Sequence, residues 1–326
     1  MVIVTGSVAY DQIMDLPGEF SSYILPEKIH QINVSFVTET HRRRFGGTGG
    51  NQAYSLSLLG IPVMLVASAG NDFQQYDEFL NKTSIDTRFI TRHQTEPTAA
   101  GFAITDMKDN QIWGFSKGAM KYAKDISLKK VISSLMLKQV QHDESIPFIV
   151  IGPNEPLAIA RYVDECVELD IPFAFDPAFY IPTLPVDVLK KGVAYARIIF
   201  GNDYEIEMLK SKLRINNYEL RDGQILVTTL GEKGSRISVR TSRRQSVKDI
   251  RVGAANVKKV VDPTGAGDAY RAGFIAGFVE KKDIRMCGQM GAVAASFAIE
   301  KYGTMEHRFT QEEFGKRMMM SGERRG

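Results

Sequence analysis

The chain has 326 residues, of which 44% are hydrophobic and 24% charged, and this predicts a soluble globular protein built from one large domain with an appended element. Its 41 basic and 38 acidic residues leave a formal net charge of +3, a balance that excludes nucleic acid and anionic membranes as main partners. A basic leader, a Cys-x-x-Cys pair and an apolar run of the roughly 18 residues that a membrane span needs are all missing, so we expect a cytoplasmic protein.

The N-terminal part of the chain predicts strands of two kinds. Residues 2–4 are continuously apolar and predict a buried first strand. Residues 32–37 alternate between apolar and polar side chains, which is typical of a half-buried antiparallel strand. Residues 99–115 contain two apolar stretches around a polar turn and predict a hairpin. We therefore expect a small β-sheet built from two separated segments, residues 11–45 and 98–118.

The rest of the chain alternates short apolar stretches with helical periods. The predicted strands are residues 63–68, 148–151, 173–176, 198–201 and 225–229. The predicted helices are residues 49–59, 155–169, 203–210, 268–279 and 287–299. This alternation predicts a mostly parallel sheet that is covered by helices on both faces, within one large domain of residues 1–10, 46–97 and 119–326. Ligands of such sheets bind beyond the carboxyl ends of the strands.

The run Asp-Pro-Thr-Gly-Ala-Gly-Asp at residues 262–268 precedes an apolar helical stretch. Two close glycines at a helix start leave backbone N–H groups facing a ligand, and the helix dipole adds positive potential there. These features predict an anion site suited to a phosphoryl group in transfer. Asp268 is then either an acid that only stabilises the first helical turn or a general base that takes a hydroxyl proton. A Walker-type P-loop is excluded because its glycine and lysine run is missing.

Three further runs allow a structural and a functional interpretation. The glycine-rich run at residues 46–51 predicts either a hinge with a helix cap or a loop that lays a substrate against bare backbone, with Asn51 donating a hydrogen bond. Asn202 and Glu205 follow a strand one helical turn apart, as a capping pair or as groups that orient phosphates and a hydrated Mg²⁺. Residues 229–234 follow another strand and predict a turn on which a nucleotide rests.

In this order, the four runs resemble the motifs of the ribokinase (PfkB-type) family of sugar and nucleoside kinases, over essentially the whole chain. Within that family the chain most resembles the bacterial adenosine kinases, through residues 4–11, 115–120, 201–205 and 268–274. The resemblance implies a ribokinase-like three-layer α/β fold, with a mostly parallel central sheet and a small β-sheet lid. Gly46 and Gly47 would be the hinge of that lid.

The resemblance also implies roles for single residues. Asp268 would be the catalytic base, and the anion hole would consist of Gly265, Ala266 and Gly267. The acceptor would be bound by Ser7, Asp11, Ser35, Gly47, Asn51, Phe102, Phe115 and Phe179. ATP would be bound by Asn202, Glu205, Thr229, Gly231, Gly234 and Gly267, with Mg²⁺ held through phosphates and water near Asn202 and Glu205. A monovalent cation such as K⁺ is expected near Asp262, Thr264 and Gly303, and a homodimer is expected through the lid.

One position departs from the bacterial adenosine kinases, which carry glutamines shortly after the dipeptide that corresponds to Asp176-Pro177. This chain has Phe179 and Tyr180 there. An amide reads a purine edge by paired hydrogen bonds, whereas an aromatic ring stacks.

Our first hypothesis is therefore ATP-dependent phosphorylation of the 5′-hydroxyl of a nucleoside, with adenosine first, as in purine salvage. A sugar or sugar-acid kinase is the second hypothesis, and a non-catalytic nucleotide-binding regulator is the third. Arg271 is interpreted either as a screen for phosphate charge or as a plain salt bridge. Residues 42–44, three arginines, are interpreted either as a solvated lid face or as an attraction for phosphate.

Overall fold

A computed structural model describes residues 1–108, 110–138, 146–241 and 246–322. Within this part of the chain, nine strands form the main sheet in the order β13-β12-β11-β10-β9-β8-β1-β4-β5. They are β1 Val2–Thr5, β4 Val63–Ala69, β5 Ile85–Arg92, β8 Phe148–Ile151, β9 Phe173–Phe175, β10 Ile198–Asn202, β11 Ile225–Thr229, β12 Ser235–Thr241 and β13 Ser246–Val252. Neighbours from β5 to β11 pair in parallel, and β12 and β13 add an antiparallel edge. The predicted, mostly parallel sheet is confirmed.

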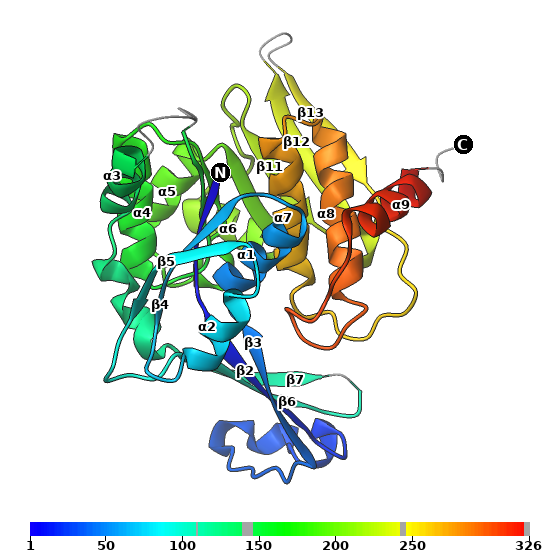
Figure 1. The fold of residues 1–326 in the computed structure, drawn as a ribbon. Coiled ribbons are helices and arrows are strands. Elements are labelled where there is room, and N and C mark those ends of the chain that lie inside the picture. Colours follow the sequence, from blue (N-terminus) through cyan, green and yellow to red (C-terminus); the bar gives the residue numbers. More distant parts are fainter. Residues whose placement is uncertain (109, 139–145, 242–245, 323–326) are drawn as a thin grey trace.

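Helices cover the main sheet on both faces (Figure 1). They are α1 Thr48–Leu58, α2 Gln74–Leu80, α3 Leu128–Lys138, α4 Pro156–Glu168, α5 Val186–Tyr195, α6 Asp203–Leu213, α7 Ala266–Val279, α8 Ile284–Ala298 and α9 Gln311–Gly322. Val2 and Val4 belong to a core with α1, α7 and α8, whereas Ile3 belongs to a second core with α4, α5 and α6. Alternate residues of one strand thus enter opposite layers, as expected for a strand buried on both faces.

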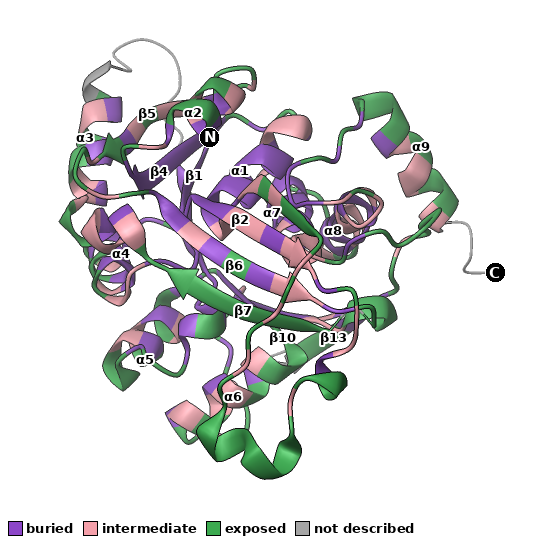
Figure 2. Cartoon of the chain, turned by 90° about the horizontal axis from the view of Figure 1, so that it is seen from below, coloured by how far each residue is buried: buried purple, intermediate pink, exposed green. Residues whose placement is uncertain are grey.

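A second sheet of four strands lies below the main body, in the order β3-β2-β6-β7 (Figures 1 and 2). Its strands are β2 Ala9–Asp15, β3 Thr40–Gly46, β6 Ala99–Thr105 and β7 Gln111–Ser116. They come from two separated parts of the sequence, and the predicted hairpin of β6 and β7 is confirmed. Every residue of β7, at the outer edge of this small sheet, is exposed.

The strand predicted at residues 32–37 is wrong, because no strand occurs there. The segment follows two short 3₁₀ helices, Phe20–Ser22 and Pro26–Gln31, at the far end of the small sheet. The Phe36 ring packs edge-on against Phe20 and Tyr23, with ring centroids 5.4 and 5.5 Å apart. The alternation therefore reflects one side chain that packs locally in an otherwise extended segment.

Candidate active site

Helix α7 begins at Ala266, directly after a glycine with a left-handed backbone. Gly265 has φ 79°, and a Cβ added there would lie 2.9 Å from the Thr304 side chain, so only glycine fits. Thr304 is itself held by a hydrogen bond from its hydroxyl to the carbonyl of Phe45. The first amides of α7 have no partner within the helix, and together with its dipole they favour an anion at this end. Asp268 lies in this first turn.

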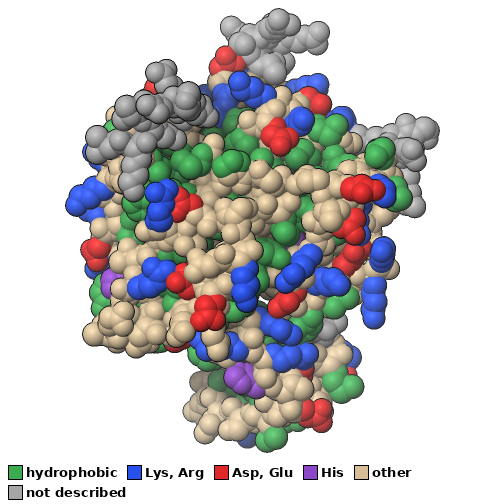
Figure 3. All heavy atoms as spheres, viewed as in Figure 1, with side chains coloured by type: hydrophobic (Ala, Val, Ile, Leu, Met, Phe, Trp, Pro, Cys, Tyr) green, Lys and Arg blue, Asp and Glu red, His purple; other side chains and the backbone are tan. Residues whose placement is uncertain are grey.

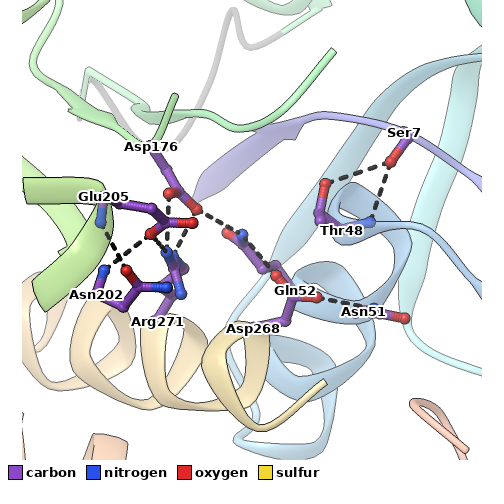
Figure 4. Close-up of polar contacts among 9 residues, drawn as sticks. All are labelled: Ser7, Thr48, Asn51, Gln52, Asp176, Asn202, Glu205, Asp268 and Arg271. Carbon is purple, nitrogen blue, oxygen red and sulfur yellow. Dashed lines mark hydrogen bonds and ion pairs between the residues drawn. The ribbon is translucent and has the colours of Figure 1, made fainter. Parts of the chain in front are cut away.

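The Asp268 carboxylate accepts hydrogen bonds from two amides of α1 (Figure 4). Asn51 Nδ2 donates to one oxygen at 2.8 Å, and Gln52 Nε2 donates to the other at 3.2 Å. Burial raises the pKa of Asp268, while the Arg271 guanidinium and the two amides act in the opposite direction. A raised pKa improves a carboxylate as a proton acceptor at neutral pH. Asn51 Oδ1 and Gln52 Oε1 are buried acceptors without a donor among the described residues, and a ligand hydroxyl would satisfy them.

The start of β2 and the glycine-rich run lie beside Asp268. The Ser7 hydroxyl accepts from Thr48 N–H at 3.1 Å, and Gly47 adopts φ 88° at the start of α1. The Asp11 carboxyl is packed so tightly against Gly46 that a Cβ added there would lie 2.2 Å from an oxygen. Burial and repulsion from Asp268 and Asp262 raise the pKa of Asp11 to about 7. The structure thus brings Ser7, Asp11, Gly47 and Asn51 together around Asp268.

The predicted aromatic residues do not all meet at this site. The registers of β2, β6 and β7 pair Asp11 with Gly101 and Gly101 with Phe115, so Phe115 lies on the Asp11 face of the small sheet. Phe102 pairs with Gly114 and therefore lies on the opposite face of the small sheet from Phe115.

Phe179 of the main body faces Phe115 of the small sheet, with ring centroids 6.4 Å apart. Both rings are about half-exposed, so part of each ring is open to solvent. Tyr180, by contrast, is buried in the core and does not shape the pocket. Ser35 lies exposed in the far segment of the small sheet, and no described contact brings it to Asp268.

Asn202 and Glu205 form the capping box of α6. The Asn202 side chain accepts from Glu205 N–H at 2.7 Å, and the Glu205 carboxylate accepts from Asn202 N–H at 2.8 Å. The capping interpretation is therefore confirmed. Within the described residues, no group of three or more His, Cys, Asp or Glu side chains is arranged to hold a metal by itself. A magnesium ion at this point would need phosphate oxygens as further ligands.

A cavity of about 620 Å³ lies between the start of α6 and the antiparallel edge of the main sheet. Its wall includes Thr228, Leu230, Lys233 and Ser235, and the buried Thr228 hydroxyl has no partner among the described residues. The adjacent turn closes with a 2.8 Å hydrogen bond from Leu230 N–H to the Gly234 carbonyl, and both Gly231 and Gly234 have positive φ. This turn follows Thr229 at the end of β11, so the cavity is suited to a polar, nucleotide-sized ligand.

Asp262 ties two loops together beneath the start of α7. One carboxylate oxygen accepts from Thr264 N–H and the other from Gly303 N–H, both at 2.9 Å. The three residues predicted to surround a monovalent cation are thus neighbours. Both Asp262 oxygens already accept backbone N–H groups, so this carboxylate stabilises the two loops.

The three arginines of β3 connect the small sheet to the body through ion pairs and ring contacts. Arg43 stacks over Tyr10 at 3.5 Å and pairs with Asp72 at 2.9 Å, and Arg44 lies 3.5 Å from Glu306. Arg42 pairs with Asp15 and lies 4.4 Å from the Tyr302 ring. Basic and acidic side chains alternate at this junction in Figure 3. The arginines are therefore engaged rather than freely solvated.

Sequence reasoning missed Gln52 beside Asp268, gave Asp176 no role in the site, and left the role of Arg271 open. Gln52 is fully buried next to Asn51, and Asp176 is buried at the end of β9. Arg271 was noted only as a phosphate screen or a salt bridge. It is an ion-pair partner of Asp176, with Nη2 2.9 Å from the carboxylate. The sequence shows a polar residue at the end of each predicted strand, which marks the edge where ligands bind. It does not show which of these side chains contact one another.

The described residues contain no helix that is both long enough and apolar enough to cross a membrane.

Residues 7–310 match the profile of the pfkB family of carbohydrate kinases. In sequence the chain is 31% identical over 307 residues to a nucleoside kinase of Methanothermobacter thermautotrophicus, which covers 93% of this chain and 90% of that protein.

In structure the chain is similar to the nucleoside kinase of Burkholderia thailandensis solved in complex with inosine, with a TM-score of 0.85 and 27% identity over 99% of this chain and 98% of that chain. The same kinase solved with ADP-inosine gives a TM-score of 0.83 and 28% identity, over 99% of this chain and 96% of that chain.

Proposed function

The chain belongs to the pfkB family of carbohydrate kinases, and from this premise we propose that it transfers the γ-phosphoryl group of ATP to the 5′-hydroxyl of a nucleoside. The observation that carries the proposal is the Asp268 carboxylate in the first turn of α7, next to the first amides of that helix and held by Asn51 and Gln52. A proton acceptor and an anion site within one helical turn are the two parts that phosphoryl transfer to an alcohol needs.

The proposed reaction has one chemical step. Asp268 accepts the proton of the 5′-hydroxyl while that oxygen forms a bond to the γ-phosphorus. The bond from the γ-phosphorus to the bridging oxygen breaks, and ADP leaves with the electron pair. The amides of Gly265, Ala266 and Gly267 stabilise the charge of the transferring group, where a single lost donor typically costs about 10²–10³ in rate. Mg²⁺ bound to the ATP phosphates, near Asn202 and Glu205, would neutralise developing charge.

The acceptor is a nucleoside in this proposal because the site offers both a ribose end and a base end. Asp11 and Asn51 present acceptors for ribose hydroxyls beside Asp268, and Ser7 and Gly47 complete that wall. Phe115 and Phe179 would stack on the base from the small sheet and the body. Stacking distinguishes poorly between purines, so adenosine and inosine are both candidate acceptors. The nucleoside kinases to which the chain is similar, one of them solved with inosine, support this choice.

We assign the ATP base and ribose to the cavity next to the turn that contains Thr229, Gly231 and Gly234. The buried Thr228 hydroxyl in its wall has no hydrogen-bond partner among the described residues. A monovalent cation is proposed beside Asp262, Thr264 and Gly303. Turnover measured in K⁺ and in a large organic cation at equal ionic strength tests that site. A rate independent of the cation would argue against it.

A sugar or sugar-acid acceptor is the second candidate, and the aromatic Phe179 in place of a hydrogen-bonding amide favours it. An acceptor panel with ATP and Mg²⁺ decides, with adenosine, inosine, cytidine, ribose and fructose tested at equal concentration and ADP release as the readout. We expect at least one nucleoside to exceed every free sugar in kcat/KM. Phosphorylation of a free sugar but no nucleoside would overturn the proposed acceptor, and binding without product would favour a non-catalytic regulator.

We also propose a homodimer formed through the small sheet. Edge strand β7 presents unpaired backbone groups together with Ile112, Trp113 and Phe115, each more than 40% exposed. The mass in solution, measured by light scattering for the wild type and for Trp113→Lys, tests this. A monomeric wild type would contradict it.

A further inference from the structure

Asp176 and Arg271 form a buried ion pair beside the proposed base. Arg271 Nη2 donates a hydrogen bond to one Asp176 oxygen at 2.9 Å, and Nε lies 2.5 Å from the other oxygen as a close charge contact without hydrogen-bond geometry (Figure 4). The side chains are only 9% and 2% exposed. Such a pair holds a fixed geometry, and removing one partner leaves an uncompensated buried charge. Asp176 directly follows β9 and Arg271 lies on α7, so the pair adds a polar connection between two elements that share a hydrophobic core.

The Asp176 end of this pair begins the turn that carries Phe179. Asp176 donates its N–H to the Ile151 carbonyl at 3.0 Å, and two residues later Ala178 adopts φ 42°, a left-handed backbone that alanine rarely takes. A strained turn keeps its shape only when its surroundings fix it. The turn presents Phe179, which is 56% exposed and faces Phe115. The carboxylate of Asp176 therefore anchors the ring proposed to stack on the acceptor.

The Arg271 end lies against the residue that precedes the base. A Cβ added to Gly267 would lie 2.8 Å from Arg271 Nη1, so the guanidinium is packed beneath the backbone of the anion site. Arg271 follows Asp268 by one turn of α7 and also lies 3.6 Å from Glu205. Gln52 makes a second connection, because its Nε2 lies 3.2 Å from Asp268 and 3.5 Å from Asp176. Asp268 and the turn that begins at Asp176 are thus connected twice, through Arg271 and through Gln52.

We propose that Arg271 is a positioning residue that couples recognition of the acceptor to the catalytic carboxylate, by locking the turn of residues 176–180 against helix α7. This inference rests on the proposed function, since it assigns Phe179 to the acceptor and Asp268 to proton transfer. Arg271 does not touch the acceptor. It fixes the distance between the Phe179 ring, which contacts the nucleobase, and the Asp268 carboxylate, which receives the 5′-hydroxyl proton. Small errors in such a distance lower the rate strongly.

A different role would be a direct electrostatic effect of the guanidinium on the transferring phosphoryl group through Gly267. The two roles predict different kinetics. A direct effect lowers kcat for all acceptors and leaves the contribution of Phe179 intact. Coupling through the turn raises KM for the nucleoside and abolishes the contribution of Phe179 because the ring is no longer held in place.

A double-mutant cycle between Arg271→Gln and Phe179→Ala, with kcat/KM for adenosine as the readout, separates these roles. We expect Phe179→Ala to lower kcat/KM about tenfold in the wild type and less than about twofold in Arg271→Gln, a non-additivity typical of coupled residues. Equal factors in the two backgrounds would overturn the proposal. An unaffected Phe179→Ala in the wild type would overturn it too, because the turn would then transmit nothing.

Two further variants keep the cycle interpretable. If Arg271→Gln does not fold, the pair Asp176→Asn with Arg271→Gln removes both charges and serves as the background instead. Arg317→Gln is the matched control, because Arg317 also pairs with a carboxylate at 14% exposure, on α9. It should lower stability without changing either KM. If the wild type phosphorylates no nucleoside, the proposed function fails; if it does and the cycle is additive, only the coupling fails.

Discussion

The ionisation of Asp11 should control activity on the acid side of neutrality. Burial and repulsion from Asp268 and Asp262 raise the pKa of Asp11 to about 7. If the ionised form is the one that accepts ribose hydroxyls, kcat/KM for the nucleoside falls as the pH falls through this value. At pH 5.5 only about one molecule in thirty would be ionised, so kcat/KM should lie about thirtyfold below its plateau. The assay is kcat/KM for adenosine from pH 5 to 8.5 at saturating MgATP.

Asp11→Asn provides the decisive comparison. It removes the titrating group while the titration of ATP stays in place. It also removes a negative charge near Asp268, which lowers the pKa of that carboxylate and shifts the remaining decline to lower pH. Asp15→Asn, on the same strand but paired with Arg42 at the surface, is the control and should keep the wild-type profile. A wild-type profile that stays flat to pH 5, or an unchanged profile in Asp11→Asn, would refute the reasoning.

Two further predictions concern residues that shape the site from behind. His307 is 1% exposed under α1, and burial lowers its pKa from 6.5 to about 4, so the unfolded chain binds a proton between these values that the folded chain does not. Stability is therefore lost as the pH falls from 6.5 towards 4, and urea unfolding should show about 2 kcal/mol more loss between pH 7 and 5 for the wild type than for His307→Gln; equal losses would contradict this.

Gly265→Ala should cost at least about 1–2 kcal/mol for the left-handed backbone and lower kcat about 10²-fold by disturbing the anion site. Gly315→Ala in α9, where an added Cβ meets nothing within 4 Å, should do neither, and a fully active Gly265→Ala would count against the anion site.

Regular elements of this protein were predictable where the sequence pattern is local. Strands at residues 148–151 and 225–229 occur with the predicted bounds, because the first is a continuous apolar run and the second is made of apolar and β-branched residues. The capping interpretation of Asn202 and Glu205 was also available, since a cap is a contact over three residues. The prediction of a strand at residues 32–37 was wrong, because alternation of apolar and polar side chains does not distinguish a strand paired in a sheet from an unpaired segment in which Phe36 packs locally.

The interior of the candidate site was less predictable because its contacts are distant in sequence. Gln52 and Asp268 are 216 residues apart, and Asp176 and Arg271 are 95 residues apart. Only the strand order of the main sheet brings them to one edge. Likewise, Phe102 and Phe115 looked equivalent in the hairpin, and the register alone places them on opposite faces. The glycine-rich runs predicted where the site lies, whereas the ion pairs and hydrogen bonds among its charged side chains could be identified only in the structure.

The central claim is that Asp268 takes the proton of a nucleoside hydroxyl during phosphoryl transfer. The most direct test is the single-turnover rate of phosphoryl transfer from ATP to adenosine by the wild type and by Asp268→Asn, with binding of both substrates measured separately. Asparagine keeps the shape and accepts no proton, so we expect a rate loss of about 10²–10⁴-fold with substrate affinities changed little. A folded Asp268→Asn enzyme that transfers phosphoryl at a near wild-type rate would contradict the account.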